Sequence, residues 1–384
     1  MKHKIIPYGR HNITPEDIQA VAKTLTSDFL TQGPVVEEFE KRFAEYIGVK
    51  YAVAVSNGTA ALHLSCIALN VNDSSHVITT PMTFSASANC VRYCNGQVTF
   101  ADINPDTGLI SIESIRKILE SSPKGTYQGI IPVDFTGYPL NMEELRKLAD
   151  QYGLWIIEDA CHAPGGYFID SSGKKQYCGN GIYAELSIFS FHPVKHITTG
   201  EGGMITTNDK DLYQKLIMIR THGVTKQPDL MRKNDGGWYY EMQMLGYNYR
   251  MTDINASLGI SQLKRAREGV LRRQEIAALY DKAFEGRIQT IKPGPDVNHA
   301  YHLYVIKVNN RKELYDRLRE KGINSQVHYI PVHTLPYYQD LGYKTGSMPH
   351  AEAFYEQCLS IPMYPTLTDE EVRFVIDSVI EFAR

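Results

Sequence analysis

Short apolar runs alternate with amphipathic stretches along residues 14–255 of the chain. A short apolar run between turn signals is typical of a buried strand, and apolar residues three or four positions apart are typical of a helix. Strands that alternate with helices form a mainly parallel sheet, because parallel strands need a crossover connection. The pattern predicts one large α/β sheet with seven strands, at residues 51–55, 77–80, 98–103, 129–133, 154–157, 187–191 and 203–206.

Helix signals fill the spaces between and before these strands. Thr14 can cap a helix that starts at Pro15 and continues to Leu25. Val36, Phe39, Phe43 and Tyr46 mark one face of a second helix, which Gly48 should end. Two further helices, at residues 114–119 and 142–152, supply crossovers.

The chain is long enough for one large domain and a smaller one. A helical stretch begins at Thr252 and runs through Leu263 towards Phe284 without a Gly-Pro pair. We interpret it as the bridge from a large α/β domain with an N-terminal arm, residues 1–255, to a smaller C-terminal α+β domain, residues 256–384. The second domain should contain strands at 303–308 and 325–329 and helices at 312–321 and 370–382.

Composition narrows the class of protein without identifying it. The net charge of −3 lacks the basic excess that nucleic-acid binding needs, so we expect no nucleic-acid partner. No apolar run approaches the length of a membrane span, and residues 1–10 lack a signal-peptide core, so we expect no membrane association. Six cysteines without a Cys-x-x-Cys pair suit a reducing cytoplasm. Cys90 and Cys94 lie four positions apart, but no second ligand pair accompanies them, and we predict no metal site.

Ligands of open α/β sheets gather beyond the carboxyl ends of the strands. The segment Ser56-Asn57-Gly58-Thr59-Ala60 follows a predicted strand and opens a helix. Gly58 permits a tight turn, and free N–H groups of Thr59 and Ala60 at a helix N-terminus suit a phosphate. A turn of this kind is more often purely structural, so the segment is informative only with others.

A second segment, Trp155-Ile156-Ile157-Glu158-Asp159-Ala160-Cys161-His162, ends a buried strand in two carboxylates. A carboxylate at that edge can hold a proton on a heterocyclic nitrogen, as the pyridine ring of pyridoxal phosphate (PLP) requires. A helix cap is the ordinary alternative for such an Asp. His162 could lie against the same ring, although a single His is usually an ordinary polar residue.

The third segment surrounds Lys195, which lies between two predicted strands and precedes Gly200, Gly202 and Gly203. Burial and nearby positive charge would lower the pKa of its amine and make it a nucleophile towards an aldehyde. The glycines allow the backbone to approach a bound ring. Ser190, at the start of the segment, could donate its hydroxyl to a phosphate.

At these residues the chain resembles the DegT/StrS-type PLP-dependent nucleotide-sugar aminotransferases, which have the fold type I (aspartate aminotransferase-like) architecture. Three stretches carry the resemblance: Ser190-Phe191-His192-x-x-Lys195-x-x-Thr198-Thr199-Gly200-Glu201-Gly202-Gly203, Glu158-Asp159-Ala160-x-His162 and Gly246-Tyr247-Asn248-Tyr249-Arg250-Met251. The resemblance implies PLP as cofactor, Lys195 as its Schiff-base lysine and Asp159 as the partner of its ring nitrogen. It also implies a homodimer with shared active sites and cofactor contacts from Gly58, Thr59, Ala60, Phe84, His162, Ser190 and the partner's Asn248.

Within the family, residues 192–200 look most like the PseC group, which acts in pseudaminic acid synthesis. That resemblance implies transfer of an amino group from glutamate to C4 of a UDP-linked 4-keto-6-deoxy-N-acetylhexose. It implies substrate contacts from Tyr8, Thr31, Asn248, Arg250, Gln326, His328 and Tyr329. His196 departs from the proline of some members, which leaves the sugar open. The alternatives are an aminotransferase for a 3-keto or GDP-linked sugar, a PLP lyase acting on an amino acid, and a binding protein without activity.

Overall fold

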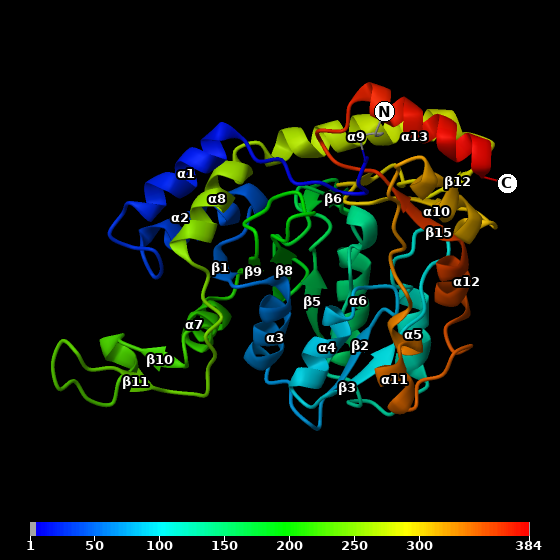
Figure 1. Cartoon of the computed structure of the whole chain (residues 1–384). Coiled ribbons are helices and arrows are strands. Elements are labelled where there is room, and N and C mark those ends of the chain that lie inside the picture. The colour runs from blue at the N-terminus through cyan, green and yellow to red at the C-terminus, as the bar shows by residue number, and fades with distance from the viewer. Residues whose placement is uncertain (1–4, 384) are drawn as a thin grey trace.

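A computed structural model describes residues 5–383 and contains one seven-stranded sheet at its centre (Figure 1). All seven predicted strands are present, and their ends differ from the predictions by up to three residues. The spatial order is β1 (Tyr51–Val55), β9 (Gly203–Thr207), β8 (Leu186–Ser190), β5 (Trp155–Asp159), β4 (Gly129–Ile131), β2 (His76–Thr79) and β3 (Gln97–Phe100).

Strand β9 alone runs against its neighbours in this sheet. It pairs antiparallel with β1 and with β8, whereas the pairs from β8 to β3 are parallel. Because β9 reverses the direction twice, β1 points the same way as β8. The carboxyl ends of the other six strands therefore meet at one edge of the sheet, which confirms the mainly parallel prediction.

Helices cover both faces of the sheet and make three layers. Val53, Val77, Ile157 and Ile188 project from one face into a core that includes α3 (Gly58–Ala68), α4 (Ala86–Tyr93) and α7 (Lys210–Ile219). The opposite face packs against α2 (Pro34–Ile47), α5 (Ile112–Glu120) and α6 (Met142–Tyr152). Alternate residues of each strand are buried on opposite faces, and this explains why the strands are apolar throughout.

The predicted N-terminal helices are confirmed. Thr14 and Asp17 form a capping box at the start of α1 (Pro15–Leu25), and Gly48 ends α2 in the left-handed conformation with φ of 83°. Ahead of α1, the N-terminal arm crosses to the C-terminal part of the chain. The Ile6 N–H donates to the Gly322 carbonyl, and the Asn324 N–H donates to the Ile6 carbonyl.

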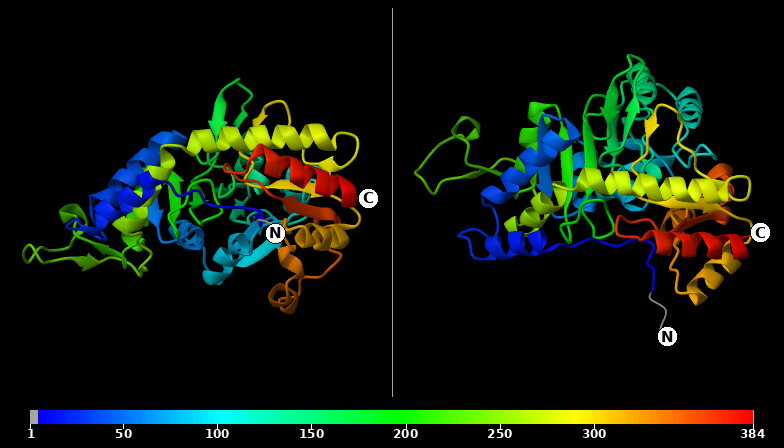
Figure 2. Two further views of the ribbon diagram at one scale, coloured as in Figure 1. Left: turned by 45° about the horizontal axis from the view of Figure 1, so that its top comes forward. Right: turned by 90° about the horizontal axis from the view of Figure 1, so that it is seen from above.

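The long bridging helix is two helices, which corrects the prediction of an unbroken stretch. Helix α8 (Asp253–Leu263) ends before Lys264, and α9 (Ala266–Phe284) begins after Arg265. Arg265 leaves helical geometry and donates to Asp17 of α1 and to the Asn12 carbonyl. The contact with α1 therefore fixes the bend, after which α9 extends across the molecule (Figure 2).

The C-terminal part forms a separate three-stranded antiparallel sheet. Its strands are β12 (Gln289–Thr290), β14 (Tyr304–Lys307) and β15 (Cys358–Ile361), with helices α10 (Arg311–Glu320), α11 (Pro336–Asp340), α12 (Pro349–Gln357) and α13 (Asp369–Phe382). The strand predicted at 325–329 is wrong. Only Gln326 bridges to Ser360, and the following residues turn towards the large sheet. The domain boundary after residue 255 stays a prediction.

Two smaller pairings lie outside these sheets. β6 (Tyr167–Ile169) pairs with β7 (Lys175–Tyr177) and β13 (Val297–Asn298), whereas β10 (Val224–Thr225) and β11 (Glu241–Met242) form a hairpin. The hairpin extends away from the body and exposes Trp238 and Leu245, which are 76% and 74% accessible (Figures 1 and 2). No helix of the described chain combines the length and the apolar character that a membrane crossing requires.

Candidate active site

A cavity of about 970 Å³ lies at the edge where the strands end. Its walls include Asn57 to Ala60 after β1 and Asp159 and His162 at and after β5. They also include Ser190, His192, Val194 and Lys195 at and after β8. These are the three segments that the sequence singled out. They come together because the carboxyl ends of β1, β5 and β8 share one edge.

The glycine turn after β1 presses against the end of β8. A Cβ atom at residue 58 would lie 3.1 Å from the Ser190 Cβ atom, which is tighter than ordinary contact. Gly58 therefore keeps the first turn of α3 beside the Ser190 hydroxyl. One detail of the prediction is wrong: the Ala60 N–H is not free, because it donates to the Asn57 side chain at 2.8 Å. Asn57 is the N-cap of α3, and such a side chain satisfies a helical N–H group.

The Asp159 carboxylate lines the cavity at the end of β5 and is held by two donors. The Ser87 hydroxyl donates to Oδ2 at 2.7 Å, and the Cys161 N–H donates to Oδ1 at 3.1 Å. Ser87 belongs to α4 and also bonds to the Thr83 hydroxyl at 2.9 Å. The sequence analysis did not identify Ser87, although Ser87 lies three residues after Phe84, a predicted cofactor contact. Both Asp159 oxygens are thereby oriented before any ligand binds.

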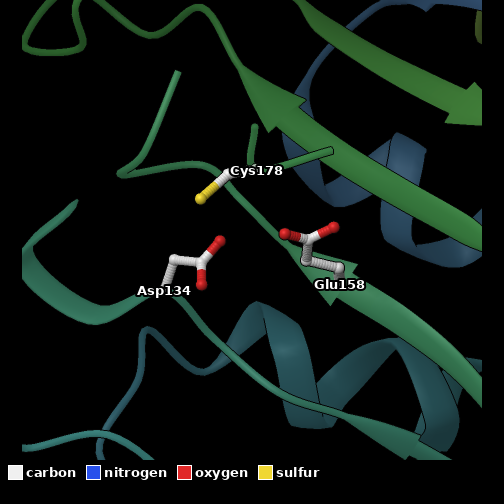
Figure 3. A group of neighbouring side chains, drawn as sticks. All are labelled: Asp134, Glu158 and Cys178. Atoms are coloured by element: carbon white, nitrogen blue, oxygen red, sulfur yellow. The ribbon is translucent and has the colours of Figure 1, made fainter. Parts of the chain in front are cut away.

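Glu158 is one residue earlier on β5, and its side chain faces the protein interior. Figure 3 shows its carboxyl group beside Asp134 and the Cys178 thiol, and one ligand atom from each of the three lies within 4.8 Å of the others. Glu158 accepts from the Ser187 hydroxyl at 2.8 Å and the Gly179 N–H at 3.0 Å. These donors favour the charged form of Glu158.

Asp134 has fewer donors than its neighbour. Its Oδ1 accepts the Leu140 N–H at 2.9 Å, and its other polar neighbours are the Cys178 thiol and the Glu158 carboxyl group. Burial, and next the charge of Glu158, raise the pKa of Asp134 well above its ordinary value, and burial also raises the pKa of Glu158. These shifts favour a state in which the two carboxyl groups share one proton. Asp134, Glu158 and Cys178 could together hold a cation. A proton shared by the two carboxyl groups already removes the repulsion between their charges.

Lys195 lies in the loop between β8 and β9, where its N–H donates to the His192 carbonyl at 2.9 Å. Burial lowers the pKa of the amine, whereas Cys161 and Asp159 act in the opposite direction. The predicted direction is therefore right, but the predicted help from nearby positive charge is wrong, because the facing groups are acidic. The residue is half-buried, and the cavity reaches it.

Neutral histidines surround the lysine. Burial, and next the charge of Lys195, lower the pKa values of His162 and His302 well below their ordinary range and that of His328 to about 3. The ring centroids of His162 and His302 are 4.4 Å apart, and His162 Nε2 bonds to the Tyr329 hydroxyl at 3.1 Å. His302 was missed, because it precedes β14, far along the chain, and no local motif marks it.

Four of the predicted substrate residues line the cavity, namely Tyr8, Gln326, His328 and Tyr329. The Phe84 ring also lines it, is 62% accessible, and lies with its centroid 6.3 Å from that of Tyr329. The other three are absent from the described lining: Thr31 bridges to Thr252, Asn248 to Thr221, and Arg250 to Val55. These three residues can contact the substrate as predicted only if they belong to the site of a second protomer or if their segments are placed differently.

Comparisons with known proteins give a consistent result. The sequence profile of the DegT/DnrJ/EryC1/StrS aminotransferase family matches residues 11–380. The chain is 37% identical to the spore coat polysaccharide biosynthesis protein SpsC of Bacillus subtilis, covering 100% of this chain and 98% of that protein. It is 37% identical to the UDP-4-amino-4,6-dideoxy-N-acetyl-beta-L-altrosamine transaminase of Campylobacter jejuni serotype O:23/36, covering 98% and 96%.

A solved structure supports the same comparison in three dimensions. The PLP form of the putative sugar aminotransferase Spr1654 from Streptococcus pneumoniae superposes with a TM-score of 0.88. The two chains are 29% identical, and the superposition covers 98% of each. The similarity therefore extends over both the large sheet and the C-terminal part.

Proposed function

This chain belongs to the DegT/DnrJ/EryC1/StrS aminotransferase family, and from that premise we propose that it moves an amino group from glutamate to C4 of a UDP-linked 4-keto-6-deoxy-N-acetylhexose. It is a PLP-dependent nucleotide-sugar aminotransferase. The similarity to the Campylobacter jejuni transaminase, whose name specifies a UDP-linked amino sugar, supports the choice of substrate, as does the PseC-like sequence around Lys195. We further propose a step in pseudaminic acid biosynthesis and a cytoplasmic location.

The observation that carries this proposal is that the Lys195 amine and the Asp159 carboxylate line one cavity together with the glycine turn at Gly58, which can accept a phosphate. The first turn of α3 and the Ser190 hydroxyl suit the phosphate of PLP, since Gly58 brings them into contact. The backbone of Gly58, Thr59 and Ala60 forms that wall of the cavity. The residues present therefore fit the cofactor.

We assign the ring contacts to Asp159, His162 and Phe84. Bound PLP supplies an electron sink when its pyridine nitrogen is protonated. Asp159 holds that proton, and Ser87 together with the Cys161 N–H keeps its oxygens in place. Phe84 and His162, which Tyr329 holds by a hydrogen bond, line the same cavity and would contact the ring of the bound cofactor.

Lys195 has two roles in the proposal. Its lowered pKa increases the fraction of free amine at neutral pH, which lets it link covalently to the aldehyde of the cofactor. With cofactor and glutamate bound, the free Lys195 amine would accept the proton from the donor Cα. It later returns a proton to the sugar carbon. The surrounding histidines stay neutral and do not compete for this proton.

The nucleotide-sugar binds in the cavity, against Tyr8, Gln326, His328 and Tyr329. We propose a homodimer in which the partner's Asn248 contacts the phosphate, and Thr31 and Arg250 act in the same shared site. The exposed apolar side chains of the β10–β11 hairpin, which include Trp238 and Leu245, support a role for this arm in contact with the partner.

The substrate is tested with product mass spectra from a panel of UDP- and GDP-linked keto-sugars with glutamate. A C4 amine on the UDP-linked 4-keto-6-deoxy-N-acetylhexose, formed faster than any other product, supports the proposal. A preference for a GDP-linked or 3-keto sugar contradicts the substrate but not the reaction class. Release of sulfide or alanine from cysteine would identify a lyase instead.

The role of Lys195 is tested by borohydride reduction of the purified protein. The expected result is a pyridoxyl mass on the peptide that contains Lys195, and loss of this mass together with turnover in Lys195→Ala. An active variant with the absorbance of lysine-bound cofactor contradicts the assignment.

A further inference from the structure

Strand β15 fixes the segment that forms one wall of the large cavity. The Gln326 N–H donates to the Ser360 carbonyl at 3.0 Å, and the Ser360 N–H donates to the Gln326 carbonyl at 2.8 Å. Further along the segment, the Cys358 thiol lies 3.7 Å from the His328 carbonyl. All residues of β15 are buried. His328 is therefore held by a buried strand, although it lies outside any helix or strand itself.

The same strand holds the ring of His328. Its Nδ1 lies 2.9 Å from the Ser360 hydroxyl oxygen. Ser360 is 1% accessible and His328 is 7% accessible, so water has little access to this hydrogen bond. The imidazole also lines the cavity beside Tyr8, whose ring centroid is 5.4 Å away. Because Nδ1 faces β15, the other nitrogen, Nε2, remains for the cavity, and it makes no hydrogen bond within residues 5–383.

The hydrogen bond with Ser360 favours one of the two neutral forms of His328. A serine hydroxyl has one hydrogen to donate. In the described chain, His328 Nδ1 is the one partner of this hydroxyl. If Nδ1 carried the ring proton and donated it, the hydroxyl hydrogen would be buried without an acceptor, which is costly. Donation from the hydroxyl to Nδ1 avoids this cost and leaves the ring proton on Nε2.

The surroundings of His328 also keep it uncharged. Burial, and next the charge of Lys195, lower its pKa to about 3. A neutral imidazole with its proton on Nε2 donates a hydrogen bond there and accepts no proton at that nitrogen. It can polarise an oxygen of a bound reactant without carrying a charge. His162 differs, because its Nε2 already bonds to the Tyr329 hydroxyl at 3.1 Å.

We propose that Ser360 is a positioning residue that fixes His328 in the Nε2-protonated form, so that His328 donates a hydrogen bond to an oxygen of the reactant bound beside Lys195. The inference rests on the proposed function only in placing the reaction in this cavity. The acceptor is a carbonyl or hydroxyl oxygen of the sugar or a carboxylate oxygen of the amino donor. Neither oxygen requires a base at this position.

Neutron diffraction from crystals of borohydride-reduced holoenzyme in heavy water locates the hydrogen nuclei directly. We expect hydrogen or deuterium on His328 Nε2, none on Nδ1, and a Ser360 hydroxyl directed at Nδ1. A proton on Nδ1, alone or together with one on Nε2, overturns the inference. This result does not depend on the amination of any sugar, so it is independent of the proposed substrate.

Ser360→Ala removes the hydroxyl and leaves the imidazole free to turn or to change its protonated nitrogen. With the best sugar of the panel, we expect kcat per bound cofactor to fall roughly tenfold, the effect of about one hydrogen bond. Ser360→Thr keeps the hydroxyl and should recover much of the rate. Ser378→Ala is the matched control and should leave kcat unchanged. Ser378 is also 1% accessible, lies on α13, and has a hydroxyl without a partner in the described part of the chain. Unchanged kcat in Ser360→Ala, or an equal loss in Ser378→Ala, contradicts the role of Ser360.

Calorimetric binding of two unreactive ligands to the reduced holoenzyme identifies the acceptor. UDP-N-acetylglucosamine represents the sugar, and glutarate represents the amino donor. We expect His328→Ala to raise Kd for one of them roughly tenfold, and His328→Gln, which keeps an N–H donor, to recover part of the loss. The ligand that responds names the acceptor, and a response from neither overturns the inference. The expected proton position and Kd changes without amination of any sugar in the panel would refute the proposed function alone.

Discussion

Glu158 and Asp159 are the same kind of side chain at adjacent positions of β5, yet their surroundings differ completely. Asp159 faces the large cavity, where a hydroxyl and an N–H group hold it. Glu158 faces the closed interior, where a second carboxyl group shares a proton with it in our interpretation. Successive side chains of a strand point to opposite faces. Asp159 can therefore take part in the reaction, whereas Glu158, one residue earlier, contributes to the stability of the interior. The comparison predicts that substitutions on the two faces affect different measurements.

Asp159→Asn should have the largest effect on catalysis. The amide has no charge to hold a proton on the pyridine nitrogen, so we expect kcat to fall by roughly 10² to 10³-fold, the typical effect of removing one preorganised electrostatic partner. Steady-state kinetics measures the loss, and the melting temperature should change little. A variant with near-normal kcat would contradict the role of Asp159.

Glu158→Ala should show the reverse. It leaves the Gly179 N–H and the Ser187 hydroxyl without their acceptor and opens a cavity in the interior. We expect a loss of about 3 kcal/mol or more in the free energy of unfolding. Denaturant titration gives this value, and kcat per folded active site, counted by cofactor content, should stay within a few-fold of wild type. Equal losses of kcat in this variant and in Asp159→Asn would remove the distinction between the faces.

Ser87→Ala should have a moderate effect on the cavity side. It deletes the hydrogen bond to Asp159 Oδ2 but leaves the Cys161 N–H in place. A hydrogen bond to a charged group contributes about 1.5 kcal/mol or more, so we expect roughly a tenfold fall in kcat. Ser87→Thr, which keeps the hydroxyl, is the matched variant and should recover part of the rate.

Asp134→Asn should have the smallest effect on kcat, because Asp134 lies outside the cavity, and the most informative pH dependence of stability. Since the folded pKa of Asp134 is raised, the folded protein keeps a proton that the unfolded chain loses above pH 3.8. Stability from this group therefore falls as pH rises from that value towards the folded pKa, by about 1.4 kcal/mol per pH unit. Asn is neutral and can still donate to Glu158, so the variant should gain stability relative to wild type as pH rises.

Unfolding of both proteins at several pH values measures this difference. A difference that stays flat from pH 4 to pH 8 would show that Asp134 is ionised. Stoichiometric metal in purified wild-type protein, lost in Asp134→Asn, would replace the shared proton with a cation site.

The sequence alone determined the local parts of this protein. Strand positions, the caps at Thr14 and Gly48, and the glycine turn at Gly58 follow from periodicity and backbone conformation, which depend on near neighbours in the chain. Lys195, Asp159 and Ser190 were found for the same reason, because each lies in a short motif at the end of a predicted strand. The parallel topology then brings those ends to one edge.

Only the tertiary structure decided contacts between distant segments. It placed Ser87 against Asp159 and His302 against His162, and it broke the bridging helix at Arg265 against Asp17. It also made residues 326–329 of the strand predicted at 325–329 part of the cavity wall. It also formed a second cavity from four separate segments, around Arg10, Lys195, Arg265 and Pro365. The physical reason is that burial, pKa and charge balance depend on everything within a few ångströms, whatever its distance along the chain.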